Sequence, residues 1–294
     1  MKKIKILIPV YNDWQSVFKL LENINQELAG WKSDVAHISI VIVNDASTEE
    51  RPVNNYVFNN LKSIQVINMK KNKGHARCNA AGLKYINENN DFDLVVLMDA
   101  DGEDRPEELG ALLCKGYEYV NNAVTANRIK RSEGFIFKFC YSAHKYLTFI
   151  FTGQTIKYGN YTCLPKFIVN KMINEPATWS SFSGSLAKVA KDRRFIPSIR
   201  GKRYFGLSKM SFMNLLKHSL SIMAVFKKTL LIRSILFLVA YFFFIMGKIS
   251  TITLIPIIAV IMMMVAVIIL SKRENISKFN NSLDNIEDIE NIYH

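Results

Sequence analysis

The chain has 294 residues, of which 49% are hydrophobic, and its formal net charge is +13. This composition excludes a disordered or collagen-like chain and supplies enough apolar side chains for a buried core. The charge is uneven, because residues 188–233 contain twelve Lys or Arg and a single acid, Asp192. Such a basic segment indicates an anionic partner, either nucleic acid, phospholipid or a phosphorylated substrate.

The N-terminal part is expected to lie in the cytoplasm. The apolar run Ile4–Val10 contains Lys5 and Pro9 and is too short for the core of a signal peptide. The four cysteines lie far apart, with no spacing typical of a zinc site, and are expected to be reduced thiols.

Residues 1–207 are predicted to form an α/β domain. Short runs rich in β-branched residues alternate with helical patterns, such as the apolar positions between Val17 and Leu28. This alternation predicts a doubly wound, mostly parallel sheet, in which ligands bind beyond the carboxyl ends of the strands. The predicted strands are Ile4–Val10, Ile38–Val43, Ile64–Ile67 and Leu94–Met98.

Acidic residues follow three of these strands. They are Asp13 after the first, Asp45 after the second and the run 99–104 after the fourth. Because parallel strands end at one edge of a sheet, these carboxylates are expected to converge on a cation or a hydrogen-bonding ligand. Asp101 and Glu103 have a spacing suited to Mg²⁺ or Mn²⁺, which prefer hard oxygen ligands. Asp104 is expected instead to cap a helix or form a turn.

Two apolar segments predict a transmembrane helix hairpin over residues 229–271. Ile249–Ser271 carries no charge and is long enough to span a bilayer. Leu230–Gly247 is apolar except for Arg233, which is expected to snorkel to the headgroups. Basic residues flank both ends of the pair and only Lys248 lies between them, so both termini are predicted to be cytoplasmic. A buried hairpin of a soluble protein is the alternative.

The segments on either side of the hairpin have different characters. Residues 208–228 predict an amphipathic helix in the membrane interface, with an ordinary core-facing helix as the alternative. Residues 272–294 are polar and acidic, and we expect them to form a disordered cytosolic tail.

Four motifs together resemble glycosyltransferase family 2. In chain order within residues 8–107 they are Ile-Pro-Val-Tyr-Asn-Asp, Val-Asn-Asp-Ala-Ser-Thr, Lys-Gly-His-Ala-Arg-Cys-Asn-Ala-Ala-Gly and Asp-Ala-Asp-Gly-Glu-Asp-Arg-Pro-Glu. The resemblance implies the GT-A fold and an inverting sugar transfer from a UDP- or GDP-linked donor. It also implies a divalent metal, Mg²⁺ or Mn²⁺, held by the Asp-x-Asp motif.

The resemblance assigns donor-binding roles to individual residues. It places Pro9, Tyr11 and Asp13 at the nucleotide base and Asp45 at the base or the ribose. Arg77 follows Gly74 at a predicted helix start, a position suited to a phosphate, with a solvated basic loop as the alternative.

The same resemblance assigns the metal and catalytic roles to the Asp-x-Asp segment. Asp99 is expected at the shared edge of ribose and metal, and Asp101 on the metal. Glu103 occupies the place of a Gln ligand in the dolichol-phosphate mannosyltransferase branch. Asn44 replaces an Asp that is common in the family.

The second half of the chain favours a phosphate acceptor. A sugar hydroxyl needs a carboxylate base, whereas a phosphate monoester is already anionic at neutral pH. None of the acids between residues 110 and 226 lies in the base motif of the hydroxyl-acceptor branches. These acids are Glu118, Glu133, Glu175 and Asp192.

The segment before the hairpin is similar to the end of bacterial polyprenyl-phosphate glycosyltransferases. Their Arg-x-x-Gly-x-Ser-Lys pattern is matched from Arg203 to Lys209, and Asn160 or Thr162 stands where an acid is frequent. This resemblance implies catalytic roles for Arg203 and Lys209, which are expected near the membrane rather than at the strand ends. The residues expected on the acceptor phosphate are Arg128, Arg131, Arg200, Arg203, Ser208 and Lys209. Binding of these cations to anionic lipid is the alternative.

The sequence therefore predicts a membrane-anchored GT-A enzyme that moves a sugar from a nucleotide-sugar to a polyprenyl phosphate, undecaprenyl or dolichyl, at the cytosolic face of a bacterial inner membrane. A family-2 enzyme acting on a hydroxyl of a lipid-linked glycan and a non-catalytic basic scaffold are the alternatives. The expected partners are the donor, the acceptor, membrane lipid and, as an open alternative, a second copy in a homo-oligomer. Nucleic acid is not expected, because the basic segment adjoins the membrane segments.

Overall fold

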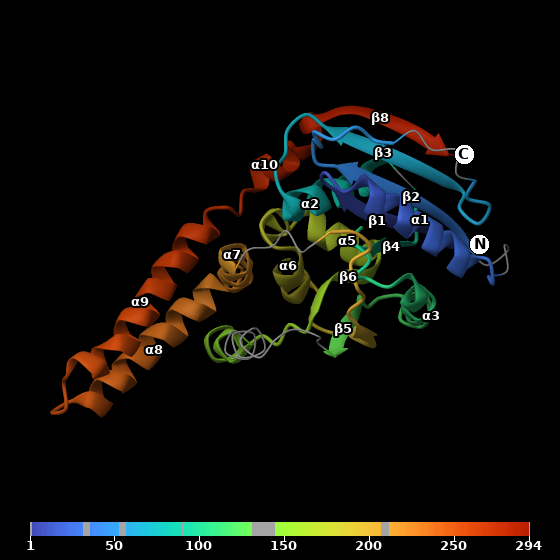
Figure 1. The fold of residues 1–294 in the computed structure, drawn as a ribbon. Coiled ribbons are helices and arrows are strands. Elements are labelled where there is room, and N and C mark those ends of the chain that lie inside the picture. Colours follow the sequence, from blue (N-terminus) through green and yellow to red (C-terminus); the bar gives the residue numbers. More distant parts are fainter. Residues whose placement is uncertain are drawn as a thin grey trace.

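The computed structural model describes residues 2–31, 36–52, 57–89, 91–130, 145–206 and 212–293. It contains a mixed eight-stranded sheet with helices on both faces and a helical hairpin that projects from one end (Figure 1). The strand order is β7-β5-β6-β4-β1-β2-β3-β8. Arg131, Ser208 and Lys209, which were expected to contact the acceptor phosphate, lie outside the described residues.

The four predicted strands form a continuous parallel block within the sheet. β1 (Lys2–Val10) pairs in parallel with β2 (Ala36–Asn44) and β4 (Leu94–Leu97), and β2 pairs in parallel with β3 (Ser63–Met69). Their apolar side chains are buried on both faces, as is usual for parallel strands covered by helices on both sides. The expected α/β fold is confirmed, and the carboxyl ends of these strands lie at one edge.

Alternation along β1 separates two cores. Ile4 and Ile6 pack against α1, whereas Leu7 packs against α2, because successive side chains of a strand point to opposite faces. One face carries α1 (Trp14–Leu28) and α3 (Leu109–Glu118). The other carries α2 (His75–Asn89), α5 (Lys166–Ile173) and α6 (Phe182–Val189).

The second half of the chain extends the sheet beyond β4. β6 (Tyr158–Pro165) is antiparallel to β4 and to β5 (Val124–Lys130), and β7 (Arg194–Ile199) is parallel to β5. Short 3-10 turns, η1 (Pro106–Glu108) and η2 (Pro176–Trp179), precede α3 and α6. After β7 the chain crosses the loop that follows β4, where the backbone N–H of Tyr204 donates to the carbonyl of Asp101 at 2.9 Å.

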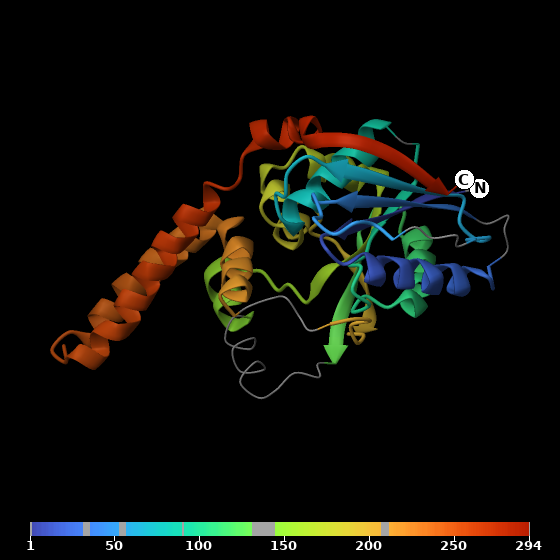
Figure 2. The ribbon, with the colours of Figure 1, turned by 45° about the horizontal axis from the view of Figure 1, so that its top comes forward.

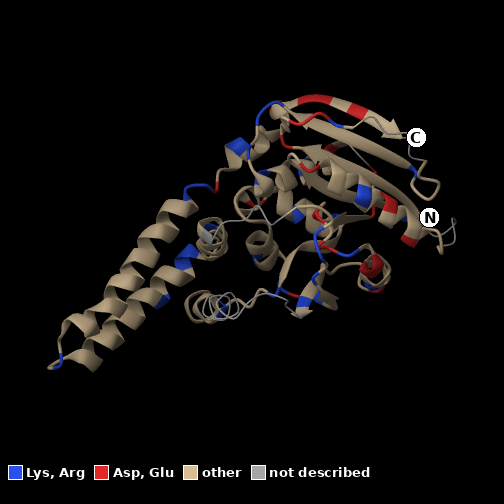
Figure 3. Ribbon diagram, viewed as in Figure 1, with Lys and Arg blue, Asp and Glu red and all other residues tan. Residues whose placement is uncertain are grey.

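The C-terminal hairpin consists of α8 (Lys227–Ile245) and α9 (Thr251–Ser271). Both helices are long and apolar enough to cross a membrane, with mean hydropathies of 1.9 and 3.0, and most of their side chains are exposed. Figure 3 shows that basic residues of the hairpin lie at its base and at the tip. α7 (Phe212–Ala224) occupies the predicted amphipathic segment, and its Leu220 and Met223 pack against the hairpin.

Arg233 of α8 contacts a neighbouring helix. Its Nη1 donates to the carbonyls of Phe149 and Ile150 at 3.3 and 2.9 Å, at the end of a helix formed by residues 145–152. The guanidinium therefore satisfies terminal carbonyls of a neighbouring helix, which is a favourable place for a cation. The predicted snorkelling of Arg233 to the headgroups stays a prediction.

The prediction of a disordered tail is wrong. After the hairpin the chain forms α10 (Ile276–Asn280), η3 (Ser282–Asn285) and β8 (Ile286–Tyr293), which pairs antiparallel with β3 (Figures 1 and 2). Pairing gives partners to the N–H and C=O groups at the edge of β3. Apolar side chains among the acids explain the order, because Phe279 is fully buried and Ile286 packs against the core.

Candidate active site

The loops after β1, β2 and β4 meet at the carboxyl edge of the sheet, as predicted. The backbone N–H of Asp45 donates to the carbonyl of Val10 at 2.9 Å, and that of Asn12 donates to Ser47 Oγ at 2.9 Å. These bonds join the loop after β1 to the loop after β2. Tyr11 is 45% exposed at the rim of this edge.

Asp45 organises the start of α2. Its two carboxylate oxygens accept hydrogen bonds from the backbone N–H groups of Lys73 and Gly74, at 2.9 and 2.8 Å. Burial raises the pKa of Asp45, and these two bonds oppose the rise. Gly74 has φ +90°, a conformation that favours glycine. Asp45 therefore fixes the loop that leads to Arg77.

Arg77 lies beside an aromatic ring on the same side of the sheet. Its guanidinium carbon is 5.6 Å from the centre of the Trp179 ring, and its Nη1 donates to the carbonyl of Lys73 at 3.3 Å. Of the other expected donor residues, Pro9 is buried within β1, and Asp13 accepts a 2.6 Å hydrogen bond from Ser16 Oγ.

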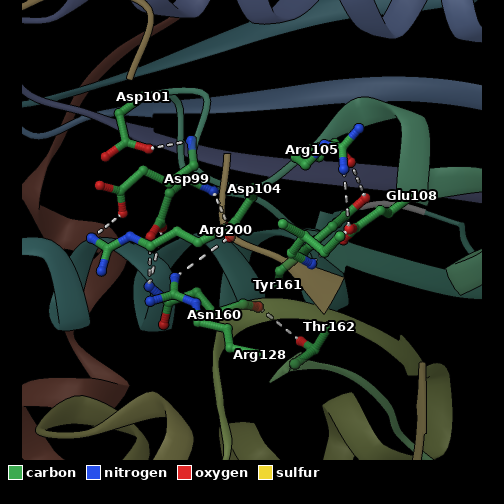
Figure 4. A network of polar contacts seen from close by, with 12 residues as sticks. Asp99, Asp101, Asp104, Arg105, Glu108, Arg128, Asn160, Tyr161, Thr162 and Arg200 are labelled. Atoms are coloured by element: carbon green, nitrogen blue, oxygen red, sulfur yellow. Dashed lines mark hydrogen bonds and ion pairs between the residues drawn. The ribbon is translucent and has the colours of Figure 1, made fainter. Parts of the chain in front are cut away.

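Asp99 has two polar neighbours from other elements (Figure 4 shows Asn160). Asn160 Nδ2 on β6 donates to Asp99 Oδ1 at 3.1 Å, and His75 Nε2 at the start of α2 lies 3.3 Å from the same oxygen. Burial would raise the pKa of Asp99, but the charge of His75 and these hydrogen bonds lower it to about 2. Asp99 is thus held as a carboxylate.

The pKa of Asp101 is shifted in the opposite direction to that of Asp99. Burial and the negative charge of Asp99 raise the pKa of Asp101 to about 6. Its Oδ2 accepts a 2.6 Å hydrogen bond from Nη1 of Arg203, and Nη2 of Arg203 lies 3.2 Å from Asp13 Oδ2. Arg203 therefore lies at the strand ends, so the expectation that it lies away from this edge is wrong.

Two further arginines contact acids of the same loop. Arg200 forms an ion pair with Glu103, and Arg128 Nη2 lies 3.8 Å from Asp104 Oδ1. Asp104 accepts a 2.9 Å hydrogen bond from the backbone N–H of Asp99, which agrees with the predicted turn-forming role. Arg200 and Arg203 thus lie beside Glu103 and Asp101, two of the acids expected on a metal, and Arg128 lies beside Asp104 of the same loop.

Comparison with known proteins identifies the family. The model described as glycosyl transferase family 2 matches residues 5–177. The chain belongs to glycosyl transferase family 2.

Two curated relatives are named undecaprenyl-phosphate 4-deoxy-4-formamido-L-arabinose transferase. The protein from Photorhabdus laumondii is 28% identical over 232 residues, and that from Erwinia tasmaniensis is 28% identical over 226 residues. Both alignments cover 74% of this chain and 65% of the relative. The chain therefore spans slightly less than two thirds of the length of these family-2 relatives.

Solved structures of other glycosyltransferases share the fold. The mannosyltransferase of Pyrobaculum calidifontis with GDP-Man and Mn²⁺ has a TM-score of 0.51 at 14% identity, over 96% of this chain and 75% of that one. Glucosyl-3-phosphoglycerate synthase of Mycobacterium tuberculosis with Mn²⁺, UDP-Glc and phosphoglyceric acid has a TM-score of 0.55 at 12% identity, over 78% of this chain and 80% of that one. This family-2 chain therefore has the GT-A architecture.

The strand-end acids of this family-2 chain fit a divalent cation whose remaining ligands come from a substrate and water. Among the described residues no group of three or more His, Cys, Asp or Glu side chains has the arrangement of a metal site. Asp99 and Asp101 supply two hard carboxylates, and burial together with the charge of Asp99 raises the pKa of Asp101. Mg²⁺ is often bound by one or two carboxylates with phosphate oxygens and water completing the shell. Glu103 is engaged by Arg200 instead.

His75 is the site residue that sequence reasoning missed. It lies inside the Lys-Gly-His-Ala-Arg motif, in which the basic side chains are the predicted phosphate ligands. Its 3.3 Å approach to Asp99 depends on the packing of α2 against the sheet. Asn160, which stands where related enzymes frequently have an acid, does reach Asp99.

Proposed function

We propose that this chain is an inverting glycosyltransferase that moves one sugar from a nucleotide-sugar to a polyprenyl phosphate at a membrane surface. The observation that carries the proposal is the gathering of Arg128, Arg200 and Arg203 around the carboxylates at the strand ends. An anionic acceptor needs cations beside the donor and needs no base. The names of both curated relatives, which are undecaprenyl-phosphate sugar transferases, support the same acceptor class.

The proposed chemistry is a single in-line displacement. An oxygen of the acceptor phosphate attacks the anomeric carbon, the bond from that carbon to the donor diphosphate breaks, and the configuration inverts. Arg203 and Arg200 orient the acceptor phosphate, and we extend this role to Lys209 and Ser208. Asp99 and Asp101 would hold Mg²⁺ or Mn²⁺, which would neutralise charge on the departing diphosphate.

The described acids between residues 110 and 226 support a transfer without a dedicated base. Glu175 binds Lys188 at 2.8 Å, and Asp192 lies 3.5 Å from Arg194. Glu118 is in the last turn of α3 and interacts with the neighbouring Tyr119. Each of these three carboxylates therefore has a partner outside the strand-end cluster. Glu133 lies outside the described residues.

The donor is proposed to be UDP- or GDP-linked and to bind along the carboxyl edge of the sheet. Tyr11, Asp13, Asp45 and Arg77 lie on the loops after β1 and β2 and at the start of α2, around the strand ends. Solved GT-A neighbours contain GDP-Man or UDP-Glc, which supports a nucleotide-sugar at the corresponding edge.

We further propose that α8 and α9 span the membrane and that the chain is on the same side before and after them. β8 pairs with β3 of the catalytic sheet, so the chain returns to the domain from which the hairpin departs. Lys227 and Glu274 lie 3.2 Å apart at the base of the hairpin. Exposed apolar side chains of helix 145–152 beside α8, Tyr146 and Phe149 among them, suit a position in the interface. Basic flanks favour the cytosolic side.

Membranes containing the protein test the proposed function. They are incubated with a panel of radiolabelled UDP- and GDP-sugars, Mn²⁺, and either undecaprenyl or dolichyl phosphate. We expect label in a chloroform-soluble product with at least one donor, and no such product from Asp101→Asn membranes. A wild-type protein that binds a donor but labels neither polyprenyl phosphate contradicts the proposal.

A further inference from the structure

The C-terminal segment, residues 276–293, contacts the loop that leads to α2. The backbone N–H of Lys70 donates to the carbonyl of Asn285 at 2.7 Å, and Lys70 Nζ donates to the carbonyl of Asp284 at 2.9 Å. In the reverse direction Asn285 Nδ2 donates to the carbonyl of Lys71 at 2.9 Å. The start of loop 70–74 is therefore tied to the C-terminal segment by three hydrogen bonds.

The other end of the same loop holds a residue of the proposed donor site. Lys73 and Gly74 donate both of their backbone N–H groups to the carboxylate of Asp45. A loop of five residues thus connects Asn285, on the outside of the sheet, with Asp45 at the strand ends. A displacement at one end of so short a segment changes the geometry at the other.

A second connection runs through polar side chains to the loops after β1 and β2. Asn68 Nδ2 donates to Glu290 Oε1 at 2.7 Å, and Asn44 Nδ2 donates to Asn68 Oδ1 at 2.9 Å. The side-chain Oδ1 of Asn44 in turn accepts from the backbone N–H of Ser47 at 3.0 Å, and Ser47 Oγ accepts from that of Asn12. A continuous series of hydrogen bonds therefore connects Glu290 with the loop that carries Tyr11 and Asp13.

A third contact between the C-terminal segment and the site is made through Trp179. Phe279 of α10 is fully buried and stacks on Trp179 with ring centres 5.7 Å apart. Trp179 also contacts the guanidinium of Arg77, whose carbon is 5.6 Å from the ring centre. The same small cluster includes Ala80 of α2.

We propose that segment 276–293 positions the nucleotide-binding loops, so that donor affinity depends on residues that do not touch the donor. Asn285 and Glu290 are the positioning residues, acting through loop 70–74 and through Asn68. The inference rests on the proposed function for the identity of the ligand as a nucleotide-sugar. Because the segment follows α9 directly, it also links the donor loops to the base of the hairpin.

The test uses the full-length protein in detergent and the variants Asn285→Ala, Glu290→Ala and the double variant. Matched controls are Asn281→Ala and Glu287→Ala, whose exposed side chains lie on the same segment. UDP and GDP, each with Mn²⁺, are titrated calorimetrically, thermal melting checks folding, and donor KM and kcat are measured separately. We expect the double variant to bind the nucleotide roughly threefold to thirtyfold more weakly, with kcat at saturating donor retained. The controls should match wild type.

Unchanged nucleotide affinity in the folded double variant overturns the inference, as does an equal loss in the controls. If the double variant does not fold, the two single variants decide by the same criterion. Nucleotide binding does not depend on the acceptor. A wild type that binds UDP or GDP but transfers no sugar to polyprenyl phosphate therefore contradicts the proposed function alone. A wild type that binds neither nucleotide contradicts both.

Discussion

Arg203 and Asp101 form a 2.6 Å charge-assisted hydrogen bond across 102 residues of sequence. The bond joins a cation expected on the acceptor phosphate to a carboxylate expected on the metal, at the end of β4. Charge-assisted bonds of this kind are about twice as strong as neutral ones. The two proposed subsites are therefore adjacent, as an in-line transfer requires.

Removing the Asp101 carboxylate should abolish transfer without unfolding the domain. Asp101→Asn keeps the shape of the side chain and its hydrogen bond to the backbone N–H of Glu103, but it removes a negative charge. We expect a loss of about 100-fold or more in kcat/KM and weaker Mn²⁺-dependent nucleotide binding. Near-normal turnover of folded variant at limiting Mn²⁺ would show that Asp101 does not bind the metal.

Removing the Arg203 guanidinium should lower transfer mainly through the acceptor. Loss of a charged contact to phosphate costs about 1.5–3 kcal/mol, or roughly a tenfold to hundredfold drop in kcat/KM for the lipid. Arg203→Lys should recover part of this, because one charge remains but the bidentate geometry is lost. The measurement is transfer at varied polyprenyl phosphate, with Lys19→Ala as a control on α1, where Lys19 is half-buried and paired with Glu22. Equal losses of kcat/KM in Arg203→Ala and in the control would contradict a contact between Arg203 and the acceptor phosphate.

Asp104 should make the stability of the metal-free protein depend on pH. Burial and the charge of Asp99 raise the pKa of Asp104 to about 8, well above its ordinary value of 3.8. The folded state then binds a proton more tightly than the unfolded state. The stabilisation from this group is complete below about pH 4 and is lost as the pH rises towards 8. Melting temperatures between pH 4.5 and 8 should fall less steeply for Asp104→Asn, and parallel profiles would contradict the assignment.

The two chain ends should lie on the same side of the membrane. Pairing of β8 with β3 places the C-terminal segment with the catalytic domain, and basic residues flank both ends of the hairpin. In sealed inverted vesicles the cytosolic side of the membrane faces outward. We therefore expect tags at residues 1 and 294 both to be accessible there. Accessibility of one tag alone would mean that a single helix spans the membrane.

The parts of the fold that follow local patterns could be predicted from the sequence. The apolar runs of β1 to β4 and the acids at their ends are contiguous motifs, so Asp45, Asp99 and Asp101 were placed correctly at one edge of the sheet. The uninterrupted apolar stretch Ile249–Ser271 predicted a long apolar helix in the same way, and the structure contains it as α9.

The rest depends on contacts between distant residues. The position of Arg203 is set by the return of the chain over the loop after β4, and that of His75 by the packing of α2. The acidic residues of β8 are typical of a disordered tail. The segment is nevertheless ordered, because β8 pairs with the edge of β3 and because Phe279 of α10 is buried. Composition alone does not reveal such a partner.

The choice between a phosphate and a hydroxyl acceptor is tested most directly by comparing undecaprenyl phosphate with undecaprenol. Purified protein is supplied with Mn²⁺ and the radiolabelled nucleotide-sugar that it binds. The lipids have the same chain and differ in the phosphate that Arg200 and Arg203 would hold. We predict labelled lipid from undecaprenyl phosphate and none from undecaprenol, with transfer retained in Glu118→Gln, Glu175→Gln and Asp192→Asn. Labelling of undecaprenol at a comparable rate, or loss of all transfer in one of these carboxylate variants, would contradict a phosphate acceptor.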